Sequence, residues 1–441
     1  MKQPSKGASS QVSRLDSVSH AWRALRHRNF QLYFAGQGVS LIGTWMTRVA
    51  TSWLVYRLTN SALLLGLVSF AGQVVSFLLG PVAAVWVERL NRRRLLLWTQ
   101  AGAAIQSLAM AALTLSHRIT IREIIALSVL QGLINAFDMP ARQSFLVQMV
   151  DDRNDLGNAI AINSSMANGA RLVGPSLAGL IIAAFGEGWC FLIDGVSFFA
   201  VIASLVMMRI PHAQFHRHTG SMIAQLTEGW AYVRGFRPIR SILLLFALLS
   251  LMGFPYMVLM PVFAGLLHGG PETLGWLMSA TSVGALVSAF SLAFRKSVVG
   301  LVNMLQFAAA ILGCALIGFG FSHNFWLSML LMVFAGFGLM QVAAASNTIV
   351  QALVPEDKRA RVMGYYTMAF FGAAPFGSLM AGAMAHHIGA PLTIEVTGVF
   401  CIAGAIWFAF EAPRLSAQML PILQHAGLSD LGPELAELSD D

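Results

Sequence analysis

The chain has 441 residues, of which 56% are hydrophobic and only 11% are charged, with a formal net charge of +8. Soluble proteins carry about a quarter charged residues, so this composition argues against an ordinary soluble domain and favours a protein that sits in lipid. The positive charge does not indicate nucleic-acid binding, because Lys and Arg gather in short loops between apolar runs.

Motifs for catalysis or cofactor binding are scarce. Cys190, Cys314 and Cys401 lie in apolar stretches without CxxC or Cys/His spacing, so we expect neither disulfides nor a zinc site. The chain has no GxxxxGK[ST] loop for a nucleotide, no HExxH motif and no visible Ser-His-Asp set. We therefore expect no enzyme activity, no cofactor, no metal and no nucleotide partner.

A polar, basic segment, 1–29, opens the chain and lacks the apolar core of a signal peptide. Twelve apolar runs follow, and a helix needs about 20 such residues to cross a bilayer. The predicted spans are 30–56, 62–86, 95–116, 123–148, 158–185, 189–208, 239–266, 273–294, 300–321, 325–351, 361–386 and 390–411. This pattern predicts an all-α protein with twelve transmembrane helices in the plasma membrane, or in the inner membrane of a Gram-negative source.

The distribution of Lys and Arg predicts the orientation of the spans. One side of the membrane receives the N-terminal segment, the loop at 89–94, Arg153, the loop at 209–240 and the later basic residues up to Arg414. The other side receives only Arg57, Arg118 and Arg122. We therefore expect both termini to be cytoplasmic, which agrees with an even number of spans.

The longest loop, 209–238, divides the chain into six spans on each side. We expect an N-terminal bundle at 30–208, a cytoplasmic linker with a helical middle at 209–238, a C-terminal bundle at 239–411 and a cytoplasmic tail at 412–441. His212, His216 and His218 lie in the linker, and without an acidic or Cys partner nearby they indicate a solvated surface segment rather than a metal site.

The two halves resemble each other in sequence. "NGARLVGPSLAGLIIAAFG" (168–186) aligns with "FGAAPFGSLMAGAMAHHIG" (371–389) at one fixed offset. The glycine pairs in this alignment are Gly169 with Gly372, Gly174 with Gly377, Gly179 with Gly382, and Gly186 with Gly389. Arg171 aligns with Ala374, so the repeat predicts a shared packing scaffold with a charge in one half only.

Arg171 is unusual because it lies near the middle of a predicted span. Pro175 cannot donate to the carbonyl of Arg171, so this turn exposes a guanidinium and a free carbonyl that protein or water must satisfy. Asn168 lies on the same helical stripe, and the small residues around Gly174 form a second stripe that lets another helix approach. We expect Arg171 and Asn168 to serve a cavity or a gate; the alternative is a buried structural arginine bonded to carbonyls.

Further polar residues lie on spans that we expect to line a cavity. Arg48 occupies the outer half of the first span, where it faces the cavity or extends its charge toward the outer surface. The uncharged candidates are Gln73, Asn135, Gln341 and Asn347. Polar and ionisable side chains in a span are costly and usually face a cavity or a partner. Arg48 and these four amides are therefore candidate substrate contacts.

Carboxylates within the spans are candidates for gating or proton coupling. Asp138 and Arg142 stand four apart on one helix face, and Asp138 could pair there or with the arginines after span 2. We expect Asp138 to belong to an inner gate, with a proton-carrying role as the weaker alternative. Asp194 and Glu395 begin spans 6 and 12, where capping of a helix N-terminus is favoured and proton coupling is the alternative.

The stretch "AVWVERLNRRR" (84–94) resembles motif A of the major facilitator superfamily. The matching positions are Ala84, Glu88, Arg89, Arg92 and Arg93. The resemblance implies a latch for the cytoplasmic gate, whereas ordinary positive-inside charge is the alternative. Asn91 stands where Gly is usual, and we expect it to adopt the left-handed backbone that the turn favours.

Residues 170–179, in the fifth predicted span, resemble motif C, which is associated with proton-coupled antiporters. The matching residues are Ala170, Gly174, Pro175, Ala178 and Gly179. Two stretches, "NFQLYFAGQGVSLIGTWM" and Phe137 to Gly179, look like one exporter branch of this superfamily. That branch includes the enterobactin exporter and macrolide-efflux-type proteins. Parallel six-helix repeats with a site near the midplane are typical of this superfamily.

The resemblance implies proton-coupled efflux of small amphipathic molecules, such as drugs, siderophores or other metabolites, by alternating access. The expected partners are the lipid bilayer, a small-molecule substrate and protons. Two alternatives remain open: a facilitator or uptake transporter of the same fold, and a membrane sensor or scaffold that does not transport.

Overall fold

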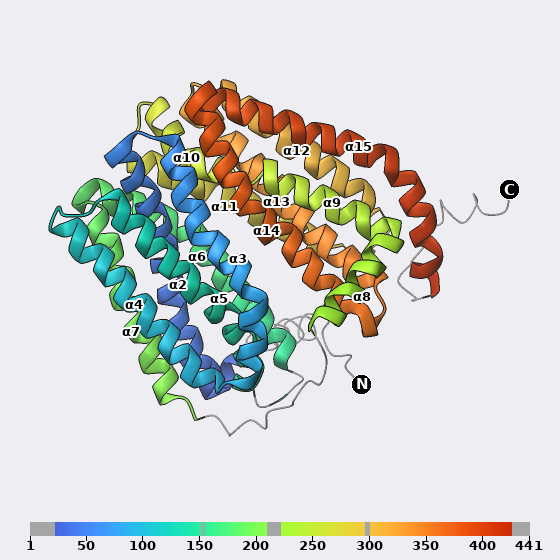
Figure 1. Cartoon of the computed structure of the whole chain (residues 1–441), viewed down its shortest axis with the longest axis horizontal. Helices are drawn as coiled ribbons and strands as arrows, with labels where there is room; N and C mark the ends of the chain where they lie inside the picture. The colour runs from blue at the N-terminus through green and yellow to red at the C-terminus, as the bar shows by residue number, and fades with distance from the viewer. Residues whose placement is uncertain (1–22, 151, 153–154, 210–221, 296–299, 426–441) are drawn as a thin grey trace, which may run out of the picture.

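A computed structural model describes residues 23–150, 152, 155–209, 222–295 and 300–425. The described residues form α-helices joined by short turns, and two helical bundles stand side by side in Figure 1. The three linker histidines and Arg153 lie outside the described residues. Because the described elements are all helical, the all-α architecture predicted from the sequence is confirmed.

The N-terminal bundle holds six long helices after a short 3₁₀ turn, η1 (Arg23–Arg26). They are α2 (Arg28–Thr59), α3 (Ala62–Arg89), α4 (Arg92–Leu115), α5 (Ile121–Leu146), α6 (Leu156–Phe185) and α7 (Glu187–Met207). A 3₁₀ turn, η2 (Val147–Met149), follows α5. Helix α2 is central, because it packs against both α6 and α7.

The C-terminal bundle begins after the linker helix α8 (Met222–Gly235), which packs against α14. Its helices are α9 (Arg237–Met252), α10 (Tyr256–Leu266), α11 (Pro271–Ala293), α12 (Leu301–Phe321), α13 (Phe325–Leu353), α14 (Glu356–Ile388) and α15 (Ala390–His425). Each of the twelve predicted spans corresponds to one of these helices or, for span 7, to two.

Two boundaries differ from the prediction. Span 7 breaks at residues 253–255, where Gly253 and Phe254 both donate to the Leu249 carbonyl and Pro255 opens α10. Helix α15 continues to His425, past the expected end of span 12 at residue 411. The polar sequence after 411 ends the apolar run but not the helix.

Among the described residues, eleven helical segments are long and apolar enough to cross a membrane. Helix α2 is the twelfth span, although its hydropathy falls below that of the others because many polar residues lie on it. It remains in the bundle because these residues face other helices: Gln37 and Ser40 are buried, and Thr47 donates to a carboxylate on α7. A hydropathy average does not distinguish polar residues that face other helices from polar residues that would face lipid.

The internal repeat is visible in the packing of the aligned glycines. A Cβ added to Gly174 would lie 2.5 Å from the Trp45 Cβ on α2, so Gly174 lets the two helices touch. Gly377 plays the same role against α9, where an added Cβ would lie 3.0 Å from the Leu251 carbonyl carbon. Gly186 and Gly389 also correspond, since both adopt positive φ, at 88° and 84°.

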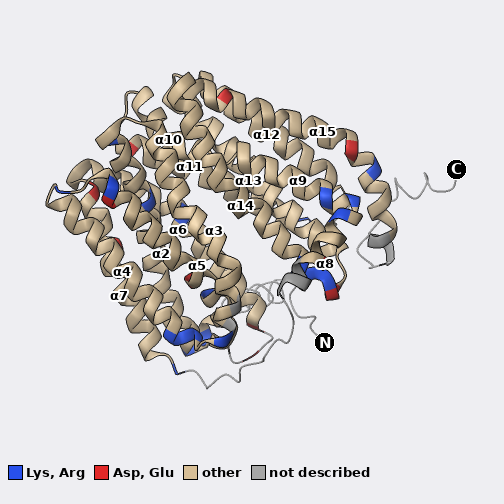
Figure 2. Cartoon of the chain, in the orientation of Figure 1, with Lys and Arg blue, Asp and Glu red and all other residues tan. Residues whose placement is uncertain are grey.

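Charged residues are concentrated at one end of the two bundles (Figure 2). The basic end is defined here by the loop at 89–94, by Arg234–Arg240 and by Lys358–Arg361; the opposite end holds Arg57, Arg118 and Arg122. Ion pairs tie helices together at both ends, among them Arg57 with Glu187 at the opposite end and Arg237 with Glu411 at the basic end. Because both arginines are about half exposed, solvent screens these pairs, and they contribute little to stability.

The glycine contact between α2 and α6 gives a testable stability difference. Gly174→Ala must push Trp45 aside, and overpacking of this kind costs about 1–3 kcal/mol. Gly169→Ala is the matched control, because no atom lies within 4 Å of its added Cβ and alanine is about 1 kcal/mol better in a helix. Thermal unfolding of the purified variants should place G174A below and G169A at or above the parent; equal midpoints would contradict this packing.

Candidate functional site

The two bundles meet where α6 crosses α11. Ser282 on α11 donates a hydrogen bond of 2.9 Å to the Arg171 carbonyl, the group that Pro175 leaves without a helical donor. Ser279 donates to the Leu172 carbonyl at 2.9 Å, and its Oγ lies 2.6 Å from that of Ser176. The predicted free carbonyl is thus confirmed, and its partner comes from the other bundle.

Glycines bring α6 and α11 together beyond these hydrogen bonds. A Cβ on Gly275 would lie 2.5 Å from the Pro175 carbonyl oxygen and 3.2 Å from the Gly179 Cα. These contacts lie in the half of the membrane toward the opposite end, because α6 runs toward that end and α11 runs away from it. Only glycine on both helices allows this approach.

Helices α3 and α14 repeat the same contact. A Cβ on Gly66 would lie 2.6 Å from the Ser378 carbonyl oxygen and 3.0 Å from the Gly382 Cα. Ser378 and Gly382 align with Pro175 and Gly179 in the internal repeat, so the same backbone atoms meet in both crossings. The two interfaces between the bundles are therefore related by the repeat.

The contacts between α3 and α14 end near the middle of both helices. Phe70 and Phe376 place their rings 5.7 Å apart, and an added Cβ on Gly372 would lie 2.6 Å from Phe77. Ala84 lies about five turns beyond Gly66 on the same face, yet it is exposed. This interface therefore closes toward the opposite end and leaves its face uncovered toward the basic end.

The other interface shows the same asymmetry. Ser165 lies on the α6 face that carries Leu172 and Gly179, about two turns before Leu172, and it is exposed. Its hydroxyl donates only to the Ala161 carbonyl of its own helix. The space between the bundles is thus closed at the opposite end and open at the basic end.

Two predicted cavity residues lie together at the centre. The guanidinium carbon of Arg48 lies 4.6 Å from the centroid of the Trp45 ring, and that of Arg171 lies 5.6 Å from the same ring. Arg48 and Trp45 come from α2, and Arg171 comes from α6. Two cations from different helices therefore share one indole near the middle of the N-terminal bundle.

Both arginines face away from lipid. Nine residues correspond to a rotation of about 180° on a helix. Val39 lies nine residues before Arg48 and is 57% exposed, while Leu180 lies nine residues after Arg171 and is 51% exposed. Since exposed apolar side chains on these spans face lipid, the two arginines lie on the helix faces directed away from lipid.

No described group neutralises these two charges. The ion pairs among the described residues involve other arginines, and neither Arg48 nor Arg171 donates a side-chain hydrogen bond there. The Nε of Arg171 is buried without a partner. The alternative of a structural arginine bonded to neighbouring carbonyls is thus not what the structure contains.

Four of the uncharged candidates form their described hydrogen bonds within their own helices. Gln73 donates to Ser69, Asn135 accepts from Gln131, Asn168 donates to the Ser164 carbonyl, and Asn347 accepts from Gln351, each within its own helix. All four are half-buried. The structure does not bring them into one cluster with the arginines.

Gln341 does not line the cavity, so this prediction was wrong. Its side chain is fully buried on α13, where its Oε1 accepts from Ser288 at 2.8 Å and Ser291 at 3.0 Å on α11. Its Nε2 approaches the Met304 sulfur on α12. Gln341 instead joins three helices of the C-terminal bundle.

The motif A segment differs in one respect from the prediction. Asn91 has φ −68° and ψ 107°, so it is not left-handed; instead its side chain accepts from the Arg94 amide and caps α4. Arg93 donates at 2.8 and 2.7 Å to the Leu205 and Val206 carbonyls at the end of α7. An N-cap uses the same extended backbone that Asn favours, which is why the turn needs no glycine here.

The remaining motif A residues have no described contact with the C-terminal bundle. Arg89 is exposed at the end of α3, Arg92 is half-buried at the start of α4, and the Glu88 side chain lies outside what the structure describes. Because the basic end is open in this structure, a latch formed by these residues would be disengaged.

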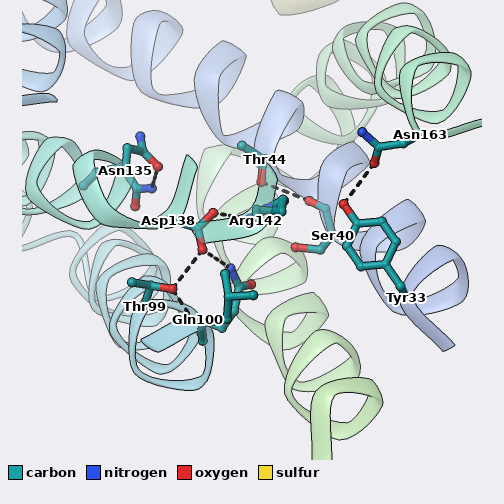
Figure 3. A network of polar contacts seen from close by, with 11 residues as sticks. Tyr33, Ser40, Thr44, Thr99, Gln100, Asn135, Asp138, Arg142 and Asn163 are labelled. Atoms are coloured by element: carbon teal, nitrogen blue, oxygen red, sulfur yellow. Dashed lines mark hydrogen bonds and ion pairs between the residues drawn. The ribbon is translucent and has the colours of Figure 1, made fainter. Parts of the chain in front are cut away.

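Asp138 is the centre of a polar network on α5 (Figure 3). Its carboxylate forms an ion pair with Arg142 and accepts hydrogen bonds from Thr99 at 2.8 Å and Gln100 at 2.7 Å on α4. Of the two partners proposed from the sequence, Arg142 is therefore the one engaged. Asp138 is only 5% exposed, so the network fixes α4 against α5 beside the open end.

Asp194 is placed differently from the N-terminal cap expected for it. Gly186 is the N-cap of α7, and Glu187 occupies the first turn, so Asp194 lies about two turns inside the helix. It is 3% exposed and accepts from Thr47 at 2.8 Å and Ser107 at 3.0 Å. Among the described residues no cation pairs with it, which distinguishes it from Asp138.

Glu395 lies in the second turn of α15 and is half-buried. Its side chain lies against α12, where an added Cβ on Gly320 would fall 2.5 Å from the Glu395 Cγ. Glu395 is therefore beyond the N-cap position as well, and it faces α12 rather than the space between the bundles.

A separate pocket of about 580 Å³ lies between the bundles on the lipid side. It is lined by residues of α6, α11 and α13, among them Leu172, Ser176, Leu177, Trp276, Ser279 and Val333. Leu177 and Trp276 are exposed apolar residues of the kind that faces lipid. This crevice is distinct from the space that holds the arginines.

Sequence reasoning missed the residues that close the opposite end. Gly66 and Gly275 each stand five residues into their helices, α3 and α11, and their equivalent placement is a signal that a wider repeat alignment could have found. Ser279 and Ser282 gave no such signal, because serines are common in apolar spans. Trp45 was overlooked because an aromatic residue in a span is ordinarily packing.

The fold and central space define this protein as a transporter of the major facilitator superfamily. The chain belongs to the transmembrane secretion effector family, whose model matches residues 19–430. It is therefore an integral membrane protein of the multi-pass type, and its relatives are transporters rather than enzymes.

Two curated relatives cover most of the chain. The staphyloferrin A transporter of Staphylococcus aureus (strain NCTC 8325 / PS 47) is 24% identical over 389 residues, which is 88% of this chain and 97% of that protein. The multidrug efflux pump Tap of Mycolicibacterium fortuitum is 26% identical over 355 residues, which is 79% of this chain and 87% of that protein.

A solved structure supports the fold. A bacterial homologue of the human lysosomal transporter Spinster, in an inward-facing and unoccupied conformation, matches with a TM-score of 0.67 and 16% identity. The match covers 90% of this chain and 98% of that one. At this level of identity the likeness concerns the fold alone.

A crosslink tests whether the interface between α6 and α11 must open during transport. The 2.6 Å separation of the Ser176 and Ser279 hydroxyls suits a disulfide in the double variant S176C/S279C, made in a C314S background because Cys314 is exposed. Oxidation should reduce transport at least tenfold, and a reductant should restore it. Full transport by the oxidised variant, with crosslinking verified by mass, would mean that this interface stays closed throughout the cycle.

Removing the charge of Asp138 should release Arg142. Asp138→Asn keeps the hydrogen-bonding shape but loses the ion pair, and breaking a largely buried pair costs about 3–5 kcal/mol. We expect slower transport and changed maleimide labelling of a cysteine at Ala84, with Thr99→Ser as a control that keeps the network. Unchanged transport and labelling in D138N would remove Asp138 from the gate.

Proposed function

We propose that the protein exports small amphipathic molecules by alternating access and couples export to proton entry. The observation that carries this proposal is the asymmetric interface: two repeat-related helix crossings close one end, while the same helix faces are exposed at the other. In a chain of this family, such an arrangement supports a transport cycle in which the closed and open ends exchange.

The orientation follows from charge. Lys and Arg are retained on the cytoplasmic side of membrane proteins, so the basic end is proposed to be cytoplasmic. The conformation is then inward-open. The two arginines lie at the closed end of a space that the substrate enters from the cytoplasm. Export requires that the glycine crossings separate and the basic end close.

The names of the relatives support the substrate class. One relative is named as a staphyloferrin A transporter and another as a multidrug efflux pump. These names favour an amphipathic organic solute over an ion or a sugar. Motif C, in which Gly174 packs against α2 and the Pro175 carbonyl lies against Gly275 of α11, supports export over uptake by resemblance.

Asp194 is the carboxylate that best suits proton coupling. It lies within the membrane, it is held by two hydroxyl groups, and no described cation pairs with it. Protonation of Asp194 therefore breaks no ion pair, whereas protonation of Asp138 would release Arg142. Thr47 links Asp194 to α2, the helix that also carries Arg48, so a change at Asp194 can reach the cavity.

Everted membrane vesicles containing the full chain test the function. A panel of ethidium and iron-free siderophores is supplied with an imposed proton gradient, and vesicles without the protein are the control. We expect energised accumulation of at least one compound, abolished by a protonophore. Accumulation that is indifferent to the protonophore would indicate a facilitator, and accumulation only in right-side-out vesicles would indicate uptake.

Replacement of the proposed proton carrier gives a separate result. Asp194→Asn should reduce gradient-driven export at least tenfold while leaving downhill counterflow of the same compound within about twofold, because only coupling depends on the proton. Glu187→Gln, on the same helix, is the control for a carboxylate that serves an ion pair. Gradient-driven export by D194N at the parental rate would exclude this carboxylate as the carrier.

A further inference from the structure

The cavity holds two positive charges without an acidic partner. Arg48 and Arg171 lie over the same Trp45 ring, at 4.6 and 5.6 Å, and neither forms an ion pair with a described residue. Unpaired charges in a span are costly and are found where they face a cavity or a pathway. The two arginines repel each other, so any anion between them would be favoured twice.

The geometry points away from a structural role. The backbone carbonyl of Arg171 is already satisfied by Ser282, while its guanidinium Nε is buried and makes no hydrogen bond. A guanidinium presents a planar fork that matches a carboxylate with two parallel hydrogen bonds. Guanidinium donors without a described partner are available for a ligand.

The two buried aspartates of the N-terminal bundle form their described contacts with residues other than Arg48 and Arg171. Asp138 is bound to Arg142, and Asp194 lies behind α2, where it accepts from Thr47 and Ser107. Arg48 itself is exposed, on the α2 face opposite Val39. A solute that enters from the basic end therefore meets the positive charges of Arg48 and Arg171 where its path ends. No described carboxylate pairs with these two arginines.

Resting on the function proposed above, we propose that Arg48 and Arg171 form an anion subsite and that the substrates are organic carboxylates with an apolar portion. The carboxylate bridges the two guanidinium groups next to Trp45. The remainder of the molecule lies along the apolar walls of the two bundles. Cations are disfavoured at this position because the two guanidinium groups repel them.

Binding to the purified full-length protein in lipid nanodiscs tests the subsite directly. The carboxylate probes are 2-naphthoate, naphthalene-2,6-dicarboxylate and citrate, and 2-naphthamide is a neutral compound of nearly the same shape as 2-naphthoate. We expect calorimetry to find at least one carboxylate that binds ten times more tightly than 2-naphthamide. Equal or weaker binding of all three carboxylates overturns the proposal.

Substitutions assign the preference to the two arginines. Arg48→Gln and Arg171→Gln should each weaken carboxylate binding at least tenfold and leave 2-naphthamide within twofold. Arg118→Gln, which removes an exposed arginine at the opposite end, should leave both affinities unchanged. Retention of the carboxylate preference in both cavity variants overturns the proposal.

A folding defect is handled by a second variant. If either glutamine variant melts well below the parent, the corresponding lysine variant replaces it, because lysine keeps the charge and loses the planar fork. Arg171→Lys should bind the dicarboxylate at least threefold more weakly than the parent, and parental affinity overturns the proposal.

Export is measured separately so that the two proposals can fail separately. If the vesicles export neutral or cationic compounds and both arginine variants export them at the parental rate, the export function stands and the anion subsite falls. If carboxylates bind in an arginine-dependent way but no compound is exported under a proton gradient, the subsite stands and the export function falls.

Discussion

The close contact of α6 with α11 is the constraint on which the rest of the structure depends. A proline in a membrane helix leaves a carbonyl without a donor, and lipid cannot supply one. Here the Arg171 carbonyl is satisfied by Ser282 of the other bundle, and Gly179 and Gly275 bring the backbones close enough for that bond. The interface is thus held by backbone groups that must find other partners, including water, whenever the bundles separate.

The repeat explains why this contact does not stand alone. Gly66 meets Gly382 and the Ser378 carbonyl just as Gly275 meets Gly179 and the Pro175 carbonyl. Two equivalent crossings on either side of the central space make a hinge-like closure of one end. The second crossing has no proline at the equivalent position, and the Ser378 hydroxyl there donates to the Ala374 carbonyl. Helix α14 instead carries Pro375, three residues earlier. The charge therefore belongs to one half only, and the proline of the other half frees a different carbonyl.

Much of this arrangement could be predicted from sequence, since the apolar runs located the twelve spans and the glycine alignment located the repeat. The failures have physical causes. Gln341 was placed in the cavity because a polar residue in a span has no preferred side in the sequence, whereas its partners Ser288 and Ser291 decide it. Asn91 was assigned a left-handed turn because glycine is usual there, yet its side chain can cap the next helix. The pairing of Arg48 with Arg171 could not be predicted, because residues far apart in sequence meet only through the packing of α2 against α6.

The most direct test of the account is the pair of distances across the two ends, measured in the same sample by spin labels. One pair joins Arg89 on α3 to Glu356 on α14 at the basic end, and the other joins Phe185 on α6 to Glu272 on α11 at the opposite end. During energised transport in proteoliposomes, the account predicts that the opposite-end distance lengthens while the basic-end distance shortens. Distances that lengthen together, or that stay unchanged during measured transport, would contradict alternating closure about the glycine crossings.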